Sequence, residues 1–304
     1  MTDAPRDARL SPPAVLMLGE PGNGKTFSLA TLAAHPYIKK FFYLFTDPGG
    51  DESLIDGLQH YNVPVDKAHW HYIPPASQGW DTLTELATKV NSMSYETIAG
   101  FKQGINKQDH RQMFDIIATL ANFKCERTGE EFGGADEWPD TYAIAFDSLT
   151  GLNKIAKDGT VGAKPTLHQG EWGVAMSMEE NFIRKFVADI RCPRVMIGHL
   201  DKQMDEIAGR MTFQVSLLGN KLAPQIPHLF SDVVYARRDG KDFVWATADD
   251  RISLKSRNFG ISEKLPPTYA PGVEKWLARK EYASAHAKDE DDTTAPAEGM
   301  PPSN

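Results

Sequence analysis

The chain has 304 residues, of which 41% are hydrophobic and 24% are charged, and its formal net charge is −8. These proportions are typical of an ordinary folded protein, and the negative charge argues against a protein whose whole surface binds polyanions. No apolar run approaches the roughly 18 residues of a membrane-spanning helix, and two cysteines without metal-type spacing, Cys125 and Cys192, indicate a reduced, cytoplasmic setting.

We expect one α/β domain at residues 14–285, flanked by segments of different composition. Residues 1–13 contain no apolar core and are expected to form a disordered arm. Residues 286–304 carry five carboxylates and one lysine among Pro, Thr, Ala and Gly, which is typical of a disordered acidic tail. Residues 124–140 are rich in Gly, Glu and Asp and are expected to be a loop or an insertion.

The strongest functional signal lies between Ala14 and Ala34. Five apolar residues, 14–18, predict a buried strand; residues 19–26 match the phosphate-loop pattern G-x-x-x-x-G-K-[ST]; and a helix should follow and stop at His35, before Pro36. The glycines let successive backbone N–H groups point at phosphate oxygens, while Lys25 can reach the β- and γ-phosphates and Thr26 can complete a Mg²⁺ shell. The expected nucleotide-binding residues are Gly19, Glu20, Pro21, Gly22, Asn23, Gly24, Lys25, Thr26 and Phe27.

Strands and helices alternate along most of the chain. Buried strands are expected at residues 41–45, 70–73, 142–147 and 194–198, and helices at 83–93, 113–120 and 172–190. This alternation implies a mostly parallel sheet with helices on both faces, and Asp239-Gly240 between apolar runs predicts a C-terminal antiparallel hairpin. We further expect a helix broken by prolines at 217–230, a strand at 252–255 and a closing helix at 272–285.

Acidic residues follow two of the expected strands. Asp147 ends the strand 142–147, so it should lie beside the phosphate loop and can bind Mg²⁺ through water. Its alternative role is to cap the following turn, which Ser148 would suit. The strand at 41–45 leads into a turn that carries Asp47, Asp51 and Glu52.

Missing motifs disfavour two other classes of phosphate-loop protein. A guanine-binding protein needs D-x-x-G after the second acid and N-K-x-D later, whereas Asp147 is followed by Ser-Leu-Thr and Asp201–Asp205 is only a near match. The short arginine-rich lid of small-molecule kinases has no counterpart in the sequence.

The order of motifs after Asp147 resembles that of the RecA family. Phe146-Asp147-Ser148 matches the family's apolar-Asp-Ser sequence, and it is followed by segment 152–170 (a mobile loop in the family), a long helix and a strand that ends in His199. Gly219-Asn220-Lys221-Leu222 resembles the Gly-Asn-Ala-Leu with which RecA resumes its fold after its second DNA loop. The resemblance covers about residues 14–260 and implies a RecA-like P-loop NTPase core that uses ATP and Mg²⁺.

Three further segments make the chain most similar to the phage-encoded, AAA-family or RecA-like ATPases of the single-strand-annealing recombinase group. They are residues 123–133, Glu171-Trp172-Gly173 and Leu254-Lys255-Ser256-Arg257.

The resemblance implies roles for several residues. Asp47 occupies the place of the general base, usually a Glu in RecA relatives, and Asp51 and Glu52 remain alternatives. His199 stands where RecA has a γ-phosphate-sensing Gln; a buried histidine with a structural hydrogen bond is the alternative. Lys255 and Arg257 resemble a K-x-R motif that reaches the ATP of a neighbouring subunit, which implies a head-to-tail homo-oligomer with the ATP site at the interface. Ordinary exposed basic residues are the alternative.

The loops after Asp147 and His199 are the DNA-binding loops of the family. The residues expected to contact single-stranded DNA are Lys154, Lys157, Lys164, Lys202 and Arg210. The predicted function is therefore a DNA-stimulated ATPase of phage recombination, annealing or replication, in the host cytoplasm, with a single-strand-binding protein as a candidate partner. The alternatives are a nucleotide-switched oligomeric interaction protein without DNA activity and a ring helicase or translocase.

Overall fold

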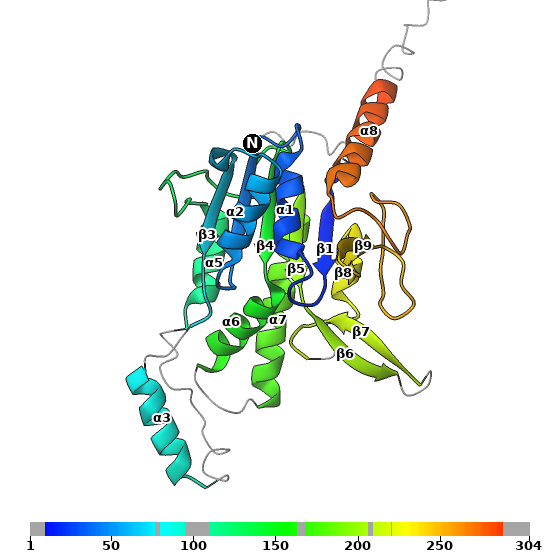
Figure 1. Ribbon diagram of the computed structural model, residues 1–304. Helices are drawn as coiled ribbons and strands as arrows, with labels where there is room; N and C mark the ends of the chain where they lie inside the picture. Colours follow the sequence, from blue (N-terminus) through cyan, green and yellow to red (C-terminus); the bar gives the residue numbers. More distant parts are fainter. Residues whose placement is uncertain are drawn as a thin grey trace, which may run out of the picture.

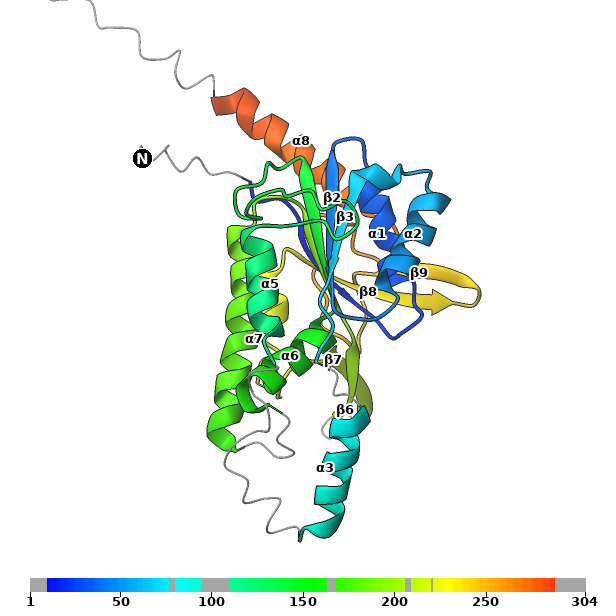
Figure 2. The same cartoon turned by 90° about the vertical axis from the view of Figure 1, so that its left-hand side faces the viewer.

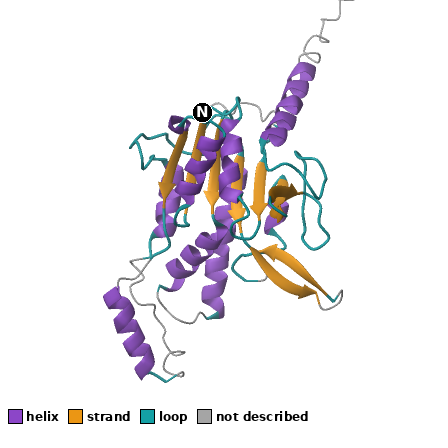
Figure 3. Cartoon of the chain, in the orientation of Figure 1, coloured by secondary structure: helices purple, strands orange, loops and turns teal. Residues whose placement is uncertain are grey.

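The computed structural model describes residues 10–76, 80–94, 110–162, 168–205, 209–219 and 221–287. They form one seven-stranded sheet with helices on both faces, and a separate two-stranded hairpin (Figures 1 and 3). The strands are β1 (Ala14–Leu18), β2 (Lys40–Phe45), β3 (Ala68–Tyr72), β4 (Tyr142–Asp147), β5 (Arg194–Gly198), β6 (Leu200–Asp205), β7 (Arg210–Val215), β8 (Asp232–Asp239) and β9 (Asp242–Ala246). The α-helices are α1 (Lys25–Ala34), α2 (Gly50–His60), α3 (Trp80–Ser92), α5 (Gln112–Ala121), α6 (Leu149–Val161), α7 (Gln169–Asp189) and α8 (Ala270–Ala287), and the short 3₁₀ helices are η1 (Val65–Lys67) and η3 (Ile226–Leu229).

The strand order in the large sheet is β3-β2-β4-β5-β1-β8-β9. All neighbouring strands are parallel except β8 and β9, which form an antiparallel hairpin at one edge. The expected fold class, a mostly parallel α/β sheet with a C-terminal antiparallel hairpin, is therefore confirmed. Because β5 lies between β1 and β4, the carboxyl ends of these three strands meet at one edge of the sheet.

Both faces of the sheet are covered, which explains the continuous apolar runs of its strands. Figure 2 shows α1 and α2 on one face and α5 and α7 on the other. Successive residues of a strand alternate between the two cores: Leu16 packs with the α5–α7 side and Met17 with the α1–α2 side. Helices α1 and α2 pack closely at Gly57, which has no side chain. A Cβ at this position would lie only 2.6 Å from the carbonyl oxygen of Phe27.

Two segments expected to be loops have regular structure. Most of residues 152–170 belong to α6 and α7. Helix α6 forms because Ser148 caps its first turn and because the apolar residues of the helix, such as Leu149, Leu152 and Ile155, recur at helical spacing and are buried. The described residues between 200 and 213 form β6 and most of β7, and Leu200 is paired with Val215. Residues 163–167 lie outside the described part of the chain.

Two other expectations were also wrong. The prolines at 224 and 227 do interrupt a helix in the segment 217–230, as expected, but the described residues before Pro224 are bends and turns and not helix, and the segment has only the short η3. Residues 252–255 make only two isolated bridges, Phe213 with Ile252 and Val233 with Lys255.

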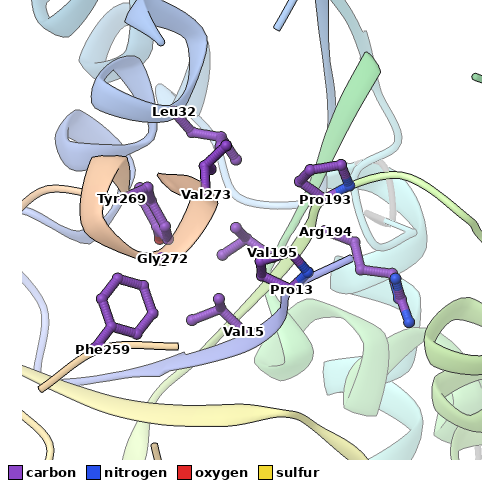
Figure 4. Close-up of a pocket in the computed structure, with 10 residues that line it drawn as sticks. All are labelled: Pro13, Val15, Leu32, Pro193, Arg194, Val195, Phe259, Tyr269, Gly272 and Val273. Atoms are coloured by element: carbon purple, nitrogen blue, oxygen red, sulfur yellow. The ribbon is translucent and has the colours of Figure 1, made fainter. Parts of the chain in front are cut away.

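The segment that precedes β1 is bound to the body of the domain. Trp276 of α8 donates a hydrogen bond from its indole to the Leu10 carbonyl at 3.1 Å, so residue 10 and those after it depart from the expected disordered arm. Beside this segment, apolar side chains of β1, α1 and α8 line a small pocket at the amino ends of the strands (Figure 4). The buried Arg194 guanidinium at its rim donates to the carbonyl oxygens of Pro12, Cys192 and Val187. Among the described helices, none is both long and apolar enough to cross a membrane.

Candidate functional site

The loop between β1 and α1 has the backbone that its glycines predict. Gly22 and Gly24 have φ angles of 75° and 74°, in the left-handed region that favours glycine, and Gly24 is the N-cap of α1. A Cβ at Gly19 would lie 2.6 Å from the carbonyl oxygen of Ala236. The first N–H groups of α1 have no partner within the helix and can bind anions.

Lys25 is buried at the mouth of this loop, with 6% of its surface exposed. Its ammonium donates hydrogen bonds to the carbonyl oxygens of Gly19 and Glu20, both at 2.9 Å. Burial lowers the pKa of Lys25, whereas the nearby carboxylates of Asp147, Asp47 and Glu20 raise it. A buried ammonium whose hydrogen-bond acceptors are neutral carbonyls is suited to receive a phosphate oxygen.

Thr26, Asp147 and Tyr43 form a buried hydrogen-bonded group. The Thr26 hydroxyl donates to Asp147 Oδ2 at 2.6 Å, and the Tyr43 hydroxyl donates to the same oxygen at 2.9 Å. Burial raises the pKa of Asp147, while these two hydrogen bonds lower it. Burial likewise raises the pKa of Tyr43 well above its ordinary value, so the phenol remains a donor.

The donor set fits Mg²⁺. Magnesium usually takes one or two protein oxygens and completes its shell with phosphate oxygens and water, and the Thr26 hydroxyl and Asp147 carboxylate supply such a pair. The described residues contain no cluster of three or more His, Cys, Asp or Glu side chains that could hold a metal alone.

Asp47 and His199 lie beside this group. Asp47 Oδ2 accepts a hydrogen bond from Ser148 Oγ at 2.7 Å and lies 4.0 Å from His199 Nε2. Burial, followed by the charge of Lys25, lowers the pKa of His199, while the Asp47 carboxylate acts in the opposite direction. Asp51 and Glu52 lie in the first turn of α2, where carboxylates favour the helix N-terminus.

Strand alternation explains why these side chains converge. In β2, β4 and β5 the odd-numbered residues Tyr43, Ala145 and Ile197 face the α1–α2 core. Asp47, Asp147 and His199 continue the same alternation at the carboxyl ends of these strands, so they point towards Thr26 at the start of α1. The structure therefore brings together Lys25, Thr26, Asp47, Asp147 and His199.

The β8–β9 hairpin borders the phosphate loop on its other side, a contact that the sequence does not reveal. Asn23 Nδ2 donates to the Ala236 carbonyl at 3.2 Å, and Arg238 Nη2 donates to the Gly22 carbonyl at 3.2 Å. The Arg238 guanidinium lies over the Phe243 ring, 5.0 Å from its centre. Tyr43 was also missed, although a tyrosine within a buried Phe- and Leu-rich strand indicates that its hydroxyl has a partner.

Lys255 and Arg257 lie at the opposite edge of the sheet from this chain's own loop. Asp232, which accepts a hydrogen bond from the Arg257 backbone N–H, pairs with Val15 near the start of β1, whereas the loop follows Leu18. The Lys255 ammonium donates to the carbonyl oxygens of His228 and Phe230, at 3.2 and 2.8 Å. The Arg257 side chain is exposed, and its guanidinium makes no hydrogen bond or ion pair with the described residues.

The described residues among those expected to bind DNA are dispersed over three elements, α6, β6 and β7. Lys154 is exposed and Lys157 is half-buried on α6, which is a helix and not the expected loop. Lys202 on β6 pairs with Glu20 at 3.4 Å, and Arg210 on β7 pairs with Asp250 at 3.0 Å. Lys164 lies outside the described residues. Figure 1 shows α6 and the β6–β7 hairpin near the carboxyl edge of the sheet.

No protein-family model and no curated protein matches the chain. Among solved structures, the chain is similar to the ATPase EscN of the type III secretion system of enteropathogenic E. coli, in a structure with its central stalk EscO, at 9% identity and a TM-score of 0.42. That alignment covers 97% of this chain but only 57% of the EscN chain. A second similarity, to the flagellar accessory protein FlaH from Methanocaldococcus jannaschii, has 11% identity and a TM-score of 0.35 and covers 89% of this chain and 88% of that one.

Proposed function

We propose that this chain is a RecA-like ATPase that binds Mg-ATP at the loop Gly19–Thr26 and hydrolyses it. The observation that carries the proposal is the hydrogen bond of 2.6 Å between Thr26 Oγ1 and Asp147 Oδ2, which brings a pair of Mg²⁺-type ligands together at the end of the phosphate loop. Lys25 and the N–H groups at the start of α1 would bind the phosphate oxygens.

The side chains around the loop have complementary roles in the attack of water on the γ-phosphate. Asp47 would orient the water and accept its proton, and the hydrogen bond from Ser148 Oγ holds its carboxylate in place. His199, whose pKa burial lowers, would contact a γ-phosphate oxygen by a hydrogen bond from its imidazole. Mg²⁺, when bound, neutralises charge on the β- and γ-phosphate oxygens, with Thr26 and Asp147 as its protein ligands.

In our proposal, Arg257 of a neighbouring copy completes the site, so the protein works as a head-to-tail homo-oligomer. Lys255 is already engaged by two carbonyl oxygens of its own chain, so Arg257 is the better candidate finger. The turn that carries Arg257 is held firmly: the buried Asp232 accepts from the N–H groups of Arg257 and Asn258, both at 2.8 Å, and Arg279 donates to the Arg257 carbonyl at 2.8 Å. These contacts fix the backbone of the turn, and the exposed guanidinium at its tip would stabilise charge on the transferred phosphate of the neighbouring copy.

We propose single-stranded DNA as the polymer on which the oligomer acts, in phage recombination, annealing or replication. The supporting observation is that α6, with Lys154 and Lys157, and the β6–β7 hairpin both lie near the edge that carries the nucleotide site (Figure 1). Such contacts would be directed at phosphates, so they would weaken with salt and read little base sequence.

The second candidate is a nucleotide-switched oligomeric interaction protein without DNA activity. Its support comes from the β6–β7 hairpin, where Lys202 and Arg210 are paired with carboxylates and are therefore less available to DNA. Met204 and Met211 lie opposite each other across the hairpin and are 61% and 42% exposed. An exposed apolar pair suits a protein partner, such as a single-strand-binding protein, better than a phosphate backbone.

The test is ATP hydrolysis by the full chain with and without single-stranded DNA at low salt, with Lys25→Ala as the inactive control. We expect wild-type turnover that DNA increases, and no turnover by the variant. An absence of both ATP binding and hydrolysis would refute the nucleotide site. Hydrolysis that DNA does not change, together with no DNA binding at low salt, would refute the DNA proposal and favour the protein-partner candidate. ATP-driven strand separation would instead indicate a ring helicase or translocase.

A further inference from the structure

The β8–β9 hairpin forms one wall of the phosphate loop. Two hydrogen bonds connect them, from Asn23 Nδ2 to the Ala236 carbonyl and from Arg238 Nη2 to the Gly22 carbonyl, both at 3.2 Å. The aromatic ring of Phe243 also lies against the loop, since a Cβ at Gly24 would be 3.2 Å from it. The hairpin and the loop are therefore in direct contact over the residues from which α1 begins.

The position of the β8–β9 hairpin determines which part of a bound nucleotide would contact the hairpin. Asp147 and Asp47 follow β4 and β2, which lie on one side of β1, whereas β8 and β9 lie on the other side (Figure 1). In a phosphate loop the hydroxyl and lysine bind at the β- and γ-phosphates, so the γ-phosphate end belongs with Thr26 and Asp147. The α-phosphate, ribose and base must then leave the loop away from Asp147, towards the hairpin.

The chemistry of the hairpin suits a base. Phe243 is 42% exposed although it is an aromatic residue in contact with the loop. The Arg238 guanidinium lies 5.0 Å from the centre of its ring and is hydrogen-bonded to the loop, which restricts the ring to this place. An exposed aromatic face stacks readily on a planar base, and a guanidinium plane can add to such a stack.

We propose that Phe243 is the stacking residue for the base of the bound nucleoside triphosphate and that Arg238 is a positioning residue that fixes the Phe243 ring beside Gly24. This inference rests on the proposed ATP site and adds to it the surface that recognises the nucleoside. The ligand class is a nucleoside triphosphate whose base lies against the β8–β9 hairpin.

A second aromatic group near α1 provides the competing position. Phe27 lies 5.4 Å from the ring of His60 and 6.1 Å from the ring of Tyr61, at the far end of α2. The rings of Phe27, His60 and Tyr61 are already packed against one another. In the described structure no hydrogen bond joins this aromatic group to residues 19–24, in contrast to the β8–β9 hairpin. Tyr61, 36% exposed, is therefore the matched control for Phe243.

The experiment measures the binding of Mg-ATP and of Mg-tripolyphosphate, which has no base, by calorimetry on the full chain. We expect Phe243→Ala to raise the Kd for Mg-ATP about tenfold and to leave tripolyphosphate binding unchanged, since it removes only base stacking. Tyr61→Ala should behave as wild type. If Phe243→Ala binds Mg-ATP as tightly as wild type does, or if Tyr61→Ala is the weakened variant, the inference is overturned.

A second variant gives an answer that does not depend on loss of affinity. Phe243→Trp should keep its affinity for Mg-ATP, and a bound base should quench the added tryptophan fluorescence, whereas tripolyphosphate should not. Equal signals with the two ligands would contradict stacking. Failure of the ATP site itself would look different, because wild type would then bind neither ligand and Lys25→Ala would change nothing.

Discussion

Asp232→Asn is the sharpest test of the turn that presents Arg257. Asp232 is fully buried, and its carboxylate accepts hydrogen bonds from five donors. Oδ1 accepts from Ser256 Oγ and from the N–H groups of Arg257 and Asn258; Oδ2 accepts from Ser231 Oγ and Asn258 Nδ2. One buried anion therefore joins the start of β8 to the turn at residues 256–258.

The contacts set the size of the effect. The side-chain carbonyl of an asparagine can still accept from the two backbone N–H groups at 2.8 Å. Its NH₂ group, however, takes the place of Oδ2 and meets Asn258 Nδ2, which lies 2.6 Å from that oxygen. The change removes a hydrogen bond to a charged group, worth about 1.5–3 kcal/mol, and leaves two buried donors facing each other. We expect the free energy of unfolding to fall by about 3 kcal/mol.

The functional consequence follows from the position of the turn. Because the phosphate loop lies at the other edge of the sheet, Asp232→Asn should leave Mg-ATP affinity unchanged. Turnover should fall at least about tenfold, because a loosened turn no longer holds Arg257 in one position for the neighbouring site.

The measurements are urea unfolding, calorimetric ATP binding and steady-state hydrolysis at a protein concentration that supports assembly. Asp239→Asn is the matched control: the same substitution at an exposed carboxylate, which pairs with Lys264 at 2.7 Å, should change none of the three. Wild-type stability in Asp232→Asn would refute the hydrogen-bond argument. Lower stability with undiminished turnover would refute the role of the turn in hydrolysis.

Three further predictions concern other parts of the molecule. Lys25→Ala should abolish ATP binding, whereas Arg257→Ala should lower turnover and leave ATP affinity unchanged. A mixture of the two variants should regain part of the activity. A mixture as inactive as its components would argue against a site shared between subunits. Ser148→Ala should lower turnover with ATP affinity retained, because Ser148 Oγ holds Asp47, and should cost about 1 kcal/mol as the N-cap of α6 is lost; unchanged kinetics in the folded variant would exclude this role. Burial among Phe42 and Phe132 lowers the pKa of His69 from 6.5 to about 4. Between these two pH values the unfolded chain binds more protons than the folded chain does. The free energy of unfolding should therefore decrease as the pH is lowered from 6.5 to 4, by at most about 3 kcal/mol. Urea unfolding of wild type and His69→Leu at pH 7 and pH 5 checks this, and equal losses in both proteins would contradict it.

The sequence was sufficient for the parts of the site that depend on local pattern. The apolar run before Gly19 and the glycine spacing defined β1, the loop and α1, and the acid that ends the apolar run 142–147 defined Asp147. Strand alternation could also have shown that Asp47, Asp147 and His199 face the same side, because each ends a strand whose odd-numbered residues share one core.

Contacts between distant segments could not be predicted in this way. The phosphate loop meets the β8–β9 hairpin only because β8 pairs with β1, and Asn23 and Ala236 are 213 residues apart in the chain. The hydrogen bond from Tyr43 to Asp147 likewise depends on the register between β2 and β4. Helix α6 is a different case: Leu149, Leu152 and Ile155 recur at helical spacing, but the resemblance to a family with a mobile loop there outweighed the local pattern.

Strand β8 connects the two functional edges of the chain. Its paired residues run from Asp232, opposite Val15, to Tyr235, opposite Leu18, so β8 pairs with β1 over residues 15–18. In its carboxyl half β8 contacts the phosphate loop through Ala236 and Arg238, and at its amino end Asp232 holds the turn with Arg257. In the proposed oligomer, β8 would therefore contact the phosphate loop of its own subunit at one end and position the finger for the next subunit at the other. Strands β1 and β8 are closely packed on both faces of the sheet and should move together as a rigid pair. A shift of the phosphate loop on nucleotide binding would therefore be passed along β8 to the turn that carries Arg257, without any further structural element.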